Sequence, residues 1–553
     1  MTDPLTNHIE VEKSMLRPIF NRKTIISALL LIFFLMLPAV RALAGTAEPD
    51  RSRFLTAVED EPDTVDFQCT SIHYTVAQNV FNRLVETVND ADGQREILPS
   101  LAESWQLSED GCTYTFHLRK GVKFSNGAAL TSSDVQFTFE RLLTHPDACN
   151  QDIADKILGA EALMSGQAET LEGFQVISDL DFSITLEEPF AAFLASLSMP
   201  GASILDEATV QKAGDSFGTD PASTIGTGSY ILREWTPEGL ILTANPKCFM
   251  GAPANEGLDL RFLTEPEETM TLFENGGLDI LDLDEIGDYA EFYMHGDIYK
   301  DRLLTVPRIG ISYIALNASV PPLDDVNVRK ALQLALNREM LLDVVYSGLG
   351  EVENGIIPHG LYGYNPELPK IPYDPDEAAA LLAAAGYPDG FDLTVQMKSS
   401  STQWEMTLMR LAASMWEKAG VHAAIKVLDE DEFMRLRKKG ELTCYTAAWM
   451  ADFNDPDNFF YTFFGNRENT TNRSLCYADE AVMARVREAR AITDRKKRVK
   501  EYRDLERIIV QEDAAWIPLH SRKRVYVLSD RVSGVKAYWN GSVKNMYRDV
   551  TIR

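Results

Sequence analysis

The alternation of strand and helix patterns between residues 391 and 450 is the feature that most constrains the fold. Apolar residues alternate with polar ones at 391–397 and again at 421–427, as they do in half-buried strands. A helical pattern follows each of these segments and ends at a glycine, the residue that most readily terminates a helix. A further strand is expected at 442–450. The order strand–helix–strand–helix–strand predicts a parallel α/β lobe with crossover helices.

Patterns elsewhere predict a mixture of α/β and α+β structure. Five apolar residues between Val328 and Leu336 recur at helical spacing, and a second helix is expected at 376–385. Residues 113–145 predict an α+β unit, in which a strand and a tight turn precede a helix. Thr131 and Asp134 have the spacing of a capping box at the start of that helix. We found no internal repeat.

The amino terminus has the organisation of a secretory signal peptide. Basic residues precede an apolar run at 25–40, and Ala42-Leu43-Ala44 then supplies a cleavage site of the small-x-small type. The run has 16 residues, fewer than the ~20 that span a bilayer. We therefore expect residues 1–44 to be a cleaved signal peptide, with Met1 or Met15 as the start. The alternative is an uncleaved, membrane-anchored sensor, which a mature protein beginning at Gly45 would exclude.

Composition narrows the class of partner. The formal net charge of −30 repels phosphate backbones, so no nucleic acid partner is expected. The charge is expected to favour solubility, and the alternative is a mild attraction of cationic ligands. All six cysteines follow the predicted cleavage site, none directly, which disfavours a lipid anchor. An oxidising compartment would permit disulfides, whose pairing the spacing does not determine. No Cys/His cluster has metal-ligand spacing, and no cofactor or metal site is expected.

Enzyme motifs are absent from the sequence. It contains no GxSxG elbow, no HExxH and no Walker A motif. His117, on an alternating strand, is expected to be a structural residue. We expect the protein not to be an enzyme, and an exported hydrolase is the alternative that product formation from incubated peptides would favour.

The loop at 451–458 is the best candidate for ligand chemistry. It follows the predicted strand at 442–450 and contains three carboxylates, and in open α/β sheets ligands bind beyond the carboxyl ends of strands. Asp452 is flanked by Trp449 and Phe453, which would partly desolvate it and favour a cationic partner such as an α-ammonium group. The alternative is that Asp452 stabilises the turn of its own loop.

Several long stretches of the sequence resemble one family. They are LPSLAESWQLSEDGCTYTFHLRKGVKF (98–124), IGTGSYILREW (225–235), LDDVNVRKALQLALNREML (323–341), AGYPDGFDL (385–393) and ADFNDPDNFF (451–460). Across nearly the whole mature chain the sequence is similar to the oligopeptide- and dipeptide-binding proteins of ABC transporters, family 5 of the extracellular solute-binding proteins.

The resemblance implies a mixed α/β, two-lobed fold of the periplasmic binding protein type II kind, with an extra inserted subdomain. Lobe I would comprise 45–90 with 216–304 and 516–553, the inserted subdomain 91–215, and lobe II 305–515. The lobes would close on the ligand about a hinge.

The resemblance also implies roles for particular residues. Asp452 falls where peptide-binding members pair with the ligand's α-amine, Ala448–Met450 where an extended ligand backbone is hydrogen-bonded, and Trp449 where a tryptophan lines the pocket. Residues 69–73, with Ser71 and His73, match the contribution of the other lobe.

One position departs from the dipeptide-binding pattern. Ser399 stands where those members carry an arginine that binds the ligand's carboxylate, and the adjacent Lys398 cannot make the same bidentate contact. Longer peptides and non-peptide ligands are therefore favoured over strict dipeptide specificity.

The function that the resemblance implies is a periplasmic receptor of an ABC importer. It would bind oligopeptides or amine-bearing, peptide-like solutes as a monomer, and deliver them to an inner-membrane permease with its ATPase subunits. The alternative is a receptor of the same family for an opine, an oligosaccharide, a nickel chelate or haem.

Overall fold

The computed structural model describes residues 50–553 except 59, 71–73, 90–94 and 543–546. The expected signal peptide lies outside the described residues, as do Ser71 and His73. Residues Ser52–Arg553 form one compact unit. In the described part of the chain, no helix is both long and apolar enough to cross a membrane.

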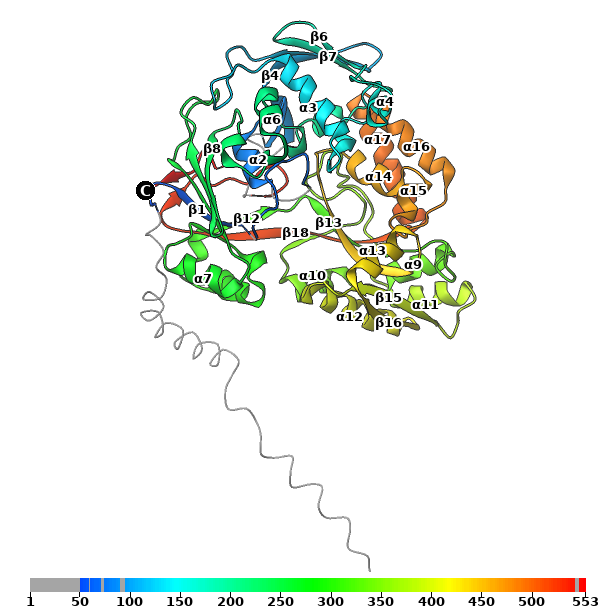
Figure 1. The fold of residues 1–553 in the computed structure, drawn as a ribbon. Coiled ribbons are helices and arrows are strands. Elements are labelled where there is room, and N and C mark those ends of the chain that lie inside the picture. Colours follow the sequence, from blue (N-terminus) through cyan, green and yellow to red (C-terminus); the bar gives the residue numbers. More distant parts are fainter. Residues whose placement is uncertain (1–49, 59, 71–73, 90–94, 543–546) are drawn as a thin grey trace, which may run out of the picture. The chain divides into compact units, whose positions relative to one another are not determined.

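One long strand, β18 (Trp516–Leu528), joins the strands of the largest sheet (Figure 1). All its pairings are antiparallel. Its first half pairs with β13 (Gly310–Leu316) and β14 (Gly350–Val352), and its second half with β12 (Leu303–Pro307) and β11 (Ile280–Asp282). The first six residues of β18 are buried. The strand thus runs from one group of partners to the other and connects both through a single backbone.

The outer strand of this sheet is β17 (Cys444–Met450), which pairs antiparallel with β13. Gly310 lies opposite Met450 and Leu316 opposite Cys444. Within the described part of the chain, no strand pairs with the other edge of β17. The sheet therefore ends in an open edge just before the 451–458 loop.

The predicted parallel pair is confirmed, and the third predicted strand is present as β17 but forms no ladder with that pair. β15 (Phe391–Lys398) and β16 (Val421–Leu428) pair in parallel over eight positions, but β17 pairs with β13 and runs antiparallel to it. Gln396 explains part of the difference, because its Oε1 accepts the Thr443 and Cys444 amides (3.1 and 3.3 Å). A side chain thus occupies the place where a ladder between β15 and β17 would begin.

The helices around this pair begin and end as the sequence predicts. Gly386 and Gly420 follow two of them with φ of 95° and 93°, a conformation that other residues rarely adopt. Thr402 and Glu405 form a capping box at the start of the longest of these helices. The helices are α9 (Val326–Leu334), α11 (Pro375–Ala384), α12 (Gln403–Lys418) and α13 (Glu430–Lys438).

Two four-stranded sheets are formed by the preceding part of the chain. One has the order β1-β10-β9-β8 and the other β4-β5-β7-β6. The helix predicted near 131 is present as α3 (Ser132–Thr144) with its capping box, and His117 pairs with Asp181 (2.7 Å), a structural contact. The strands are β1 (Phe54–Val58), β4 (Ala102–Leu107), β5 (Thr113–Leu118), β6 (Phe174–Val176), β7 (Asp181–Thr185), β8 (Tyr230–Thr236), β9 (Gly239–Ala244) and β10 (Gly257–Phe262).

Short helices and hairpins complete the compact unit, and α14, α16 and α17 pack on one another (Figure 1). The remaining elements are α2 (Thr75–Val80), β2 (Val85–Asn89), β3 (Arg95–Pro99), α4 (Ala160–Met164), α5 (Phe193–Ser196), α6 (Glu207–Ala213), α7 (Pro266–Glu274), α8 (Ala290–His295), α10 (Arg338–Tyr346), α14 (Asp457–Phe464), α15 (Arg467–Thr471), α16 (Glu480–Ala491), α17 (Arg495–Glu506), β19 (Val532–Ser533) and β20 (Thr551–Ile552).

Candidate functional site

The loop that leaves β17 is held by one asparagine. The Asn458 Oδ1 accepts the Asp452 main-chain amide (3.0 Å), and its Nδ2 donates to Asp452 Oδ2 (2.9 Å). The same Oδ1 accepts the Trp449 indole N–H (3.3 Å). Asn458 lies in the first turn of α14, so that helix fixes the direction in which the Asp452 carboxylate points.

Asp452 is open to solvent, yet protein surrounds it closely enough to change its titration. Desolvation raises the pKa of its carboxyl, the hydrogen bond from Asn458 lowers it, and the charge of Asp152 raises it further. Among the described residues, no cationic side chain forms an ion pair with Asp452. A carboxylate in this position favours a cation supplied from outside the chain.

Tyr74 and Asp152 lie within electrostatic range of Asp452, although they are some 300 residues or more away in the sequence. Burial raises the pKa of Tyr74, and the charge of Asp452 contributes to that rise. Desolvation raises the pKa of Asp152, which is exposed to solvent like Asp452. Carboxylates that are accessible to water and yet surrounded by protein are typical of a cleft. Sequence reasoning missed Tyr74 and Asp152.

The other two carboxylates of the loop do not face a ligand space. Asp455 forms a buried ion pair with Arg498 (2.6 Å from Oδ1 to Nη2), and Asp457 forms one with Arg490 (3.0 Å). Both aspartates are less than 5% exposed. The expectation of three carboxylates at the ligand edge is therefore wrong for two of them, which anchor the loop to α16 and α17.

Ala448 and Met450 line a cavity of about 660 Å³ next to this loop. Trp449, between them on β17, contacts Phe463 (5.5 Å between ring centroids) and the Arg473 guanidinium (5.4 Å), and it is not part of that lining. The alternation of a strand explains the difference, because successive side chains point to opposite faces.

The same cavity is lined by charged and aromatic groups that sequence reasoning missed. The Arg522 guanidinium lies over the rings of Tyr346 (4.6 Å) and Trp404 (4.8 Å). Asp284 is 3.2 Å from Arg522 and 3.5 Å from Arg308. Burial lowers the pKa of Arg308, and the neighbouring Arg524 and Arg522 lower it further.

One signal in the sequence could have found Arg522. Arg522, Lys523 and Arg524 follow one another on β18, so the two arginines share a face and the lysine takes the other. In the structure Lys523 pairs with the exposed Glu351 (2.9 Å), whereas both arginines contact Asp284. The two arginines on one face of the strand were visible in the sequence, but the Asp284 carboxylate that contacts both of them was not.

Lys398 and Ser399 lie at the end of β15, apart from the cavity lining. The Lys398 ammonium is 3.4 Å from Glu430, and the Ser399 amide donates to the Leu428 carbonyl (2.7 Å). Within the described residues, neither forms a hydrogen bond or an ion pair with Asp452. Ser71 and His73 lie outside the described residues.

The chain is similar to known proteins over most of its length. Residues 96–471 match the family described as bacterial extracellular solute-binding proteins, family 5 Middle. The chain is 31% identical to heme-binding protein A of Haemophilus influenzae, over 83% of this chain and 84% of that protein. It is 30% identical to a dipeptide-binding protein of Escherichia coli, over 80% of this chain and 84% of that protein.

Solved structures share the fold. The structure of HbpA2 from Haemophilus parasuis aligns with a TM-score of 0.78 at 26% identity, over 91% of this chain and 100% of that one. The murein tripeptide-binding protein MppA of Escherichia coli aligns with a TM-score of 0.71 at 22% identity, over 92% and 99%. These likenesses confirm the expected two-lobed α/β fold.

Proposed function

Because the chain belongs to family 5 of the bacterial extracellular solute-binding proteins, we propose that it is the exported receptor of an ABC importer, and that it binds peptides or peptide-like amines. The bound solute would pass to an inner-membrane permease whose ATPase subunits supply the energy. Similarity to a dipeptide-binding protein at 30% identity supports a peptide ligand.

The observation that carries this proposal is Asp452 at the end of an open strand edge. Its carboxylate is oriented by Asn458 and surrounded by protein, and it forms no ion pair with the described part of the chain. The adjacent edge of β17 presents main-chain groups without a strand partner in the described part of the chain. An extended peptide supplies both an α-ammonium group for Asp452 and main-chain groups for β17.

We place the acidic end of the ligand near Arg308. Ser399 offers no charge where dipeptide-binding members carry an arginine, whereas Arg308 and Arg522 lie in the cavity that Met450 lines. These two arginines share the single Asp284 carboxylate at 3.5 and 3.2 Å, which leaves guanidinium N–H groups for a second carboxylate.

We also propose the division of the chain into lobes. Lobe I comprises 45–90 with 216–304 and 516–553, a subdomain at 91–215 is inserted in it, and lobe II comprises 305–515. We infer a hinge at the point where β12 passes into β13, beside the middle of β18. The Arg308 main-chain amide donates to the Arg522 carbonyl (2.9 Å) at this point, which supports that position. Closure about these strands would bring Tyr74 and Asp152 toward Asp452.

The protein is proposed to release its ligand unchanged. A Cys–His contact does exist, between Cys69 Sγ and His145 Nδ1 (3.3 Å). Burial and the neighbouring Asp66 raise the pKa of the Cys69 thiol to about 12, so the thiolate that a cysteine hydrolase requires is scarce.

Haem is the second candidate ligand. The chain is 31% identical to a heme-binding protein, and Met450 and His520, two residue types that bind haem iron, both line the cavity. His520 is 1% exposed, and burial lowers its pKa to about 3, so its imidazole is neutral. A Soret band shift on adding hemin, abolished in His520→Ala, would favour haem over peptide.

Native mass spectrometry of the protein purified from the periplasm tests the proposed function. We expect a set of bound masses that fragment as peptides. A single non-peptide mass would replace the ligand class and keep the receptor role. Amino-terminal sequencing of the same sample tests export, with Gly45 as the expected first residue.

A further inference from the structure

Cys69 and Cys149 lie side by side, although 80 positions separate them in the sequence. The Cys149 amide donates to the carbonyl of Gln68, the residue before Cys69 (2.8 Å). With standard backbone dimensions, this hydrogen bond holds the two Cα atoms within about 7 Å of each other. Natural disulfides join Cα atoms at such distances.

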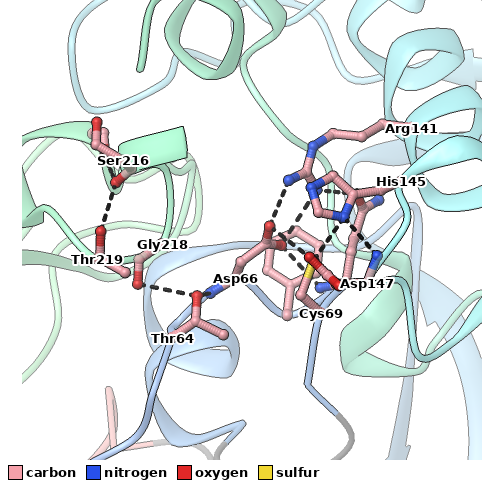
Figure 2. Close-up of polar contacts among 12 residues, drawn as sticks. Thr64, Asp66, Cys69, Arg141, His145, Asp147, Ser216, Gly218 and Thr219 are labelled. Atoms are coloured by element: carbon pink, nitrogen blue, oxygen red, sulfur yellow. Dashed lines mark hydrogen bonds and ion pairs between the residues drawn. The ribbon is translucent and has the colours of Figure 1, made fainter. Parts of the chain in front are cut away.

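Both thiols contact the turn at 145–147, where Figure 2 shows Cys69 beside His145 and Asp147. The Cys69 Sγ is 3.3 Å from His145 Nδ1, and that nitrogen accepts the Asp147 amide (3.3 Å). The Cys149 Sγ contacts the Asp147 carbonyl oxygen (3.5 Å). Both are free thiols in the structure; Cys149 is exposed and Cys69 partly exposed, so an oxidant can reach the pair.

Contacts that do not involve sulfur already fix the backbone around the pair. The Asn150 side-chain Nδ2 donates to the carbonyls of Phe67 (3.2 Å) and Thr70 (3.0 Å), and the Tyr74 hydroxyl also donates to Thr70 O (2.8 Å). Asn150 is 6% exposed. Rotation about side-chain bonds is therefore the main movement needed to bring the sulfurs together.

We propose that Cys69 and Cys149 form a disulfide under oxidising conditions, and this rests on the proposed export. The exposed Cys149 thiolate attacks the disulfide of an oxidant of the thiol–disulfide class and forms a mixed disulfide, which releases one oxidant thiol. Cys69 then attacks the Cys149 sulfur, and its proton passes through His145 Nδ1 to the second thiolate of the oxidant as that group departs. The second oxidant thiol leaves, so two thiols are oxidised and one oxidant disulfide is reduced.

The bond would fix one wall of the candidate site. Cys69 precedes the segment that leads to Tyr74, and Cys149 precedes Asp152, and these two residues lie within electrostatic range of Asp452. A covalent link between the two segments would hold Tyr74 and Asp152 in one arrangement while the lobes open and close. Ligand affinity would then depend on the redox state of the pair.

Peptide mapping of the purified full-length mature protein tests this inference. The protein is equilibrated with a glutathione buffer rich in the oxidised form, unfolded, alkylated and digested without reductant. We expect a peptide pair joined through Cys69 and Cys149, two hydrogen atoms lighter than the sum of its parts. After reduction both cysteines should be alkylated. Alkylation of both without reduction, or pairing of either with another cysteine, overturns the proposal.

Matched variants add a second readout. Cys149→Ser should lower the melting temperature of the oxidised protein by about 3 °C, because the disulfide no longer restricts the unfolded chain. Cys112→Ser is the control, since Cys112 contacts Asp110 in a different turn, and should change nothing. Equal melting temperatures for wild type and Cys149→Ser, together with alkylation of both cysteines in the map made without reductant, would contradict the pairing. Because mapping is done in vitro, it separates a failure of pairing from a failure of export.

Discussion

Asn458 contacts Asp452 twice, accepting its main-chain amide at 3.0 Å and donating to its carboxylate at 2.9 Å. The carboxylate is thereby oriented before any ligand arrives. Pre-oriented charge lowers the entropy lost on binding, so the contact bears directly on affinity.

Replacement of Asp452 tests the amine site. Asp452→Asn keeps the shape and removes the charge, and we expect peptide affinity to fall about 10- to 100-fold, as for loss of a charge-assisted hydrogen bond. Isothermal titration calorimetry with a peptide and its N-acetylated form measures this. The acetylated peptide should bind wild type and variant equally; Asp389→Asn, an exposed substitution, is the control. Unchanged affinity of the free amine for Asp452→Asn would refute the assignment.

Arg308 is expected to bind the carboxylate end of the ligand. Arg308→Gln should weaken binding of a free-acid peptide about 10-fold or more, because it removes a cation that Asp284 only partly occupies. The corresponding peptide amide should bind both proteins alike, which calorimetry would show. Arg435→Gln, exposed on α13, serves as the control. Equal losses for acid and amide would mean that Arg308 acts on the fold and not on the ligand.

Glu506 should make stability depend on pH near neutrality. Burial raises its pKa to about 7, although the amides of Ile357 and Ile356 oppose the rise. A folded pKa above the unfolded value of about 4.3 means that the protonated form stabilises the fold, and this contribution is lost as pH rises from about 4 through 7.

Glu506→Gln should therefore unfold at a higher temperature than wild type at pH 8 and show no such gain at pH 5. Thermal unfolding by circular dichroism across this range measures it. Glu351→Gln, at an exposed ion pair, should show neither effect. An identical pH profile for Glu506→Gln and wild type would contradict the assignment.

The Asp455–Arg498 pair should be a stability element. Asp455→Ala leaves the guanidinium buried without its partner, and we expect a loss of about 3–5 kcal/mol in the free energy of unfolding. Urea denaturation measures it. Glu512→Ala, at the exposed Arg507 pair, should cost less than about 1 kcal/mol. The double replacement Asp455→Leu with Arg498→Met should recover much of the loss; if it does not, packing and not charge explains the single variant.

The sequence predicted what depends on neighbouring residues. The capping boxes, the glycines after the helices and the parallel pair of β15 and β16 all follow from patterns within a few residues or one crossover. The partner of β17 could not be predicted in this way, because β13 lies about 130 residues earlier and no local pattern distinguishes one buried strand from another.

The same limit applies to the candidate site. Asp452 was predicted as the candidate anchor, but Asp455 and Asp457 are the same residue type in the same loop. Only the positions of Arg498 and Arg490, on helices that follow, separate a buried ion pair from an open carboxylate. Arg308 and Tyr74 were missed because neither stands in a motif, and tertiary structure alone brings each beside the cleft.

The place of β18 in the chain has a consequence for biosynthesis. This strand pairs with four others, the first of them more than 200 residues upstream, and it comes at 516–528 of 553 residues. As the nascent polypeptide leaves the ribosome, the four partner strands emerge first, and β18, which joins them, emerges only when almost all of the chain has been made. The sheet can close only then, so the protein remains incompletely folded for most of its synthesis, a state in which it can still be threaded through a narrow translocation pore.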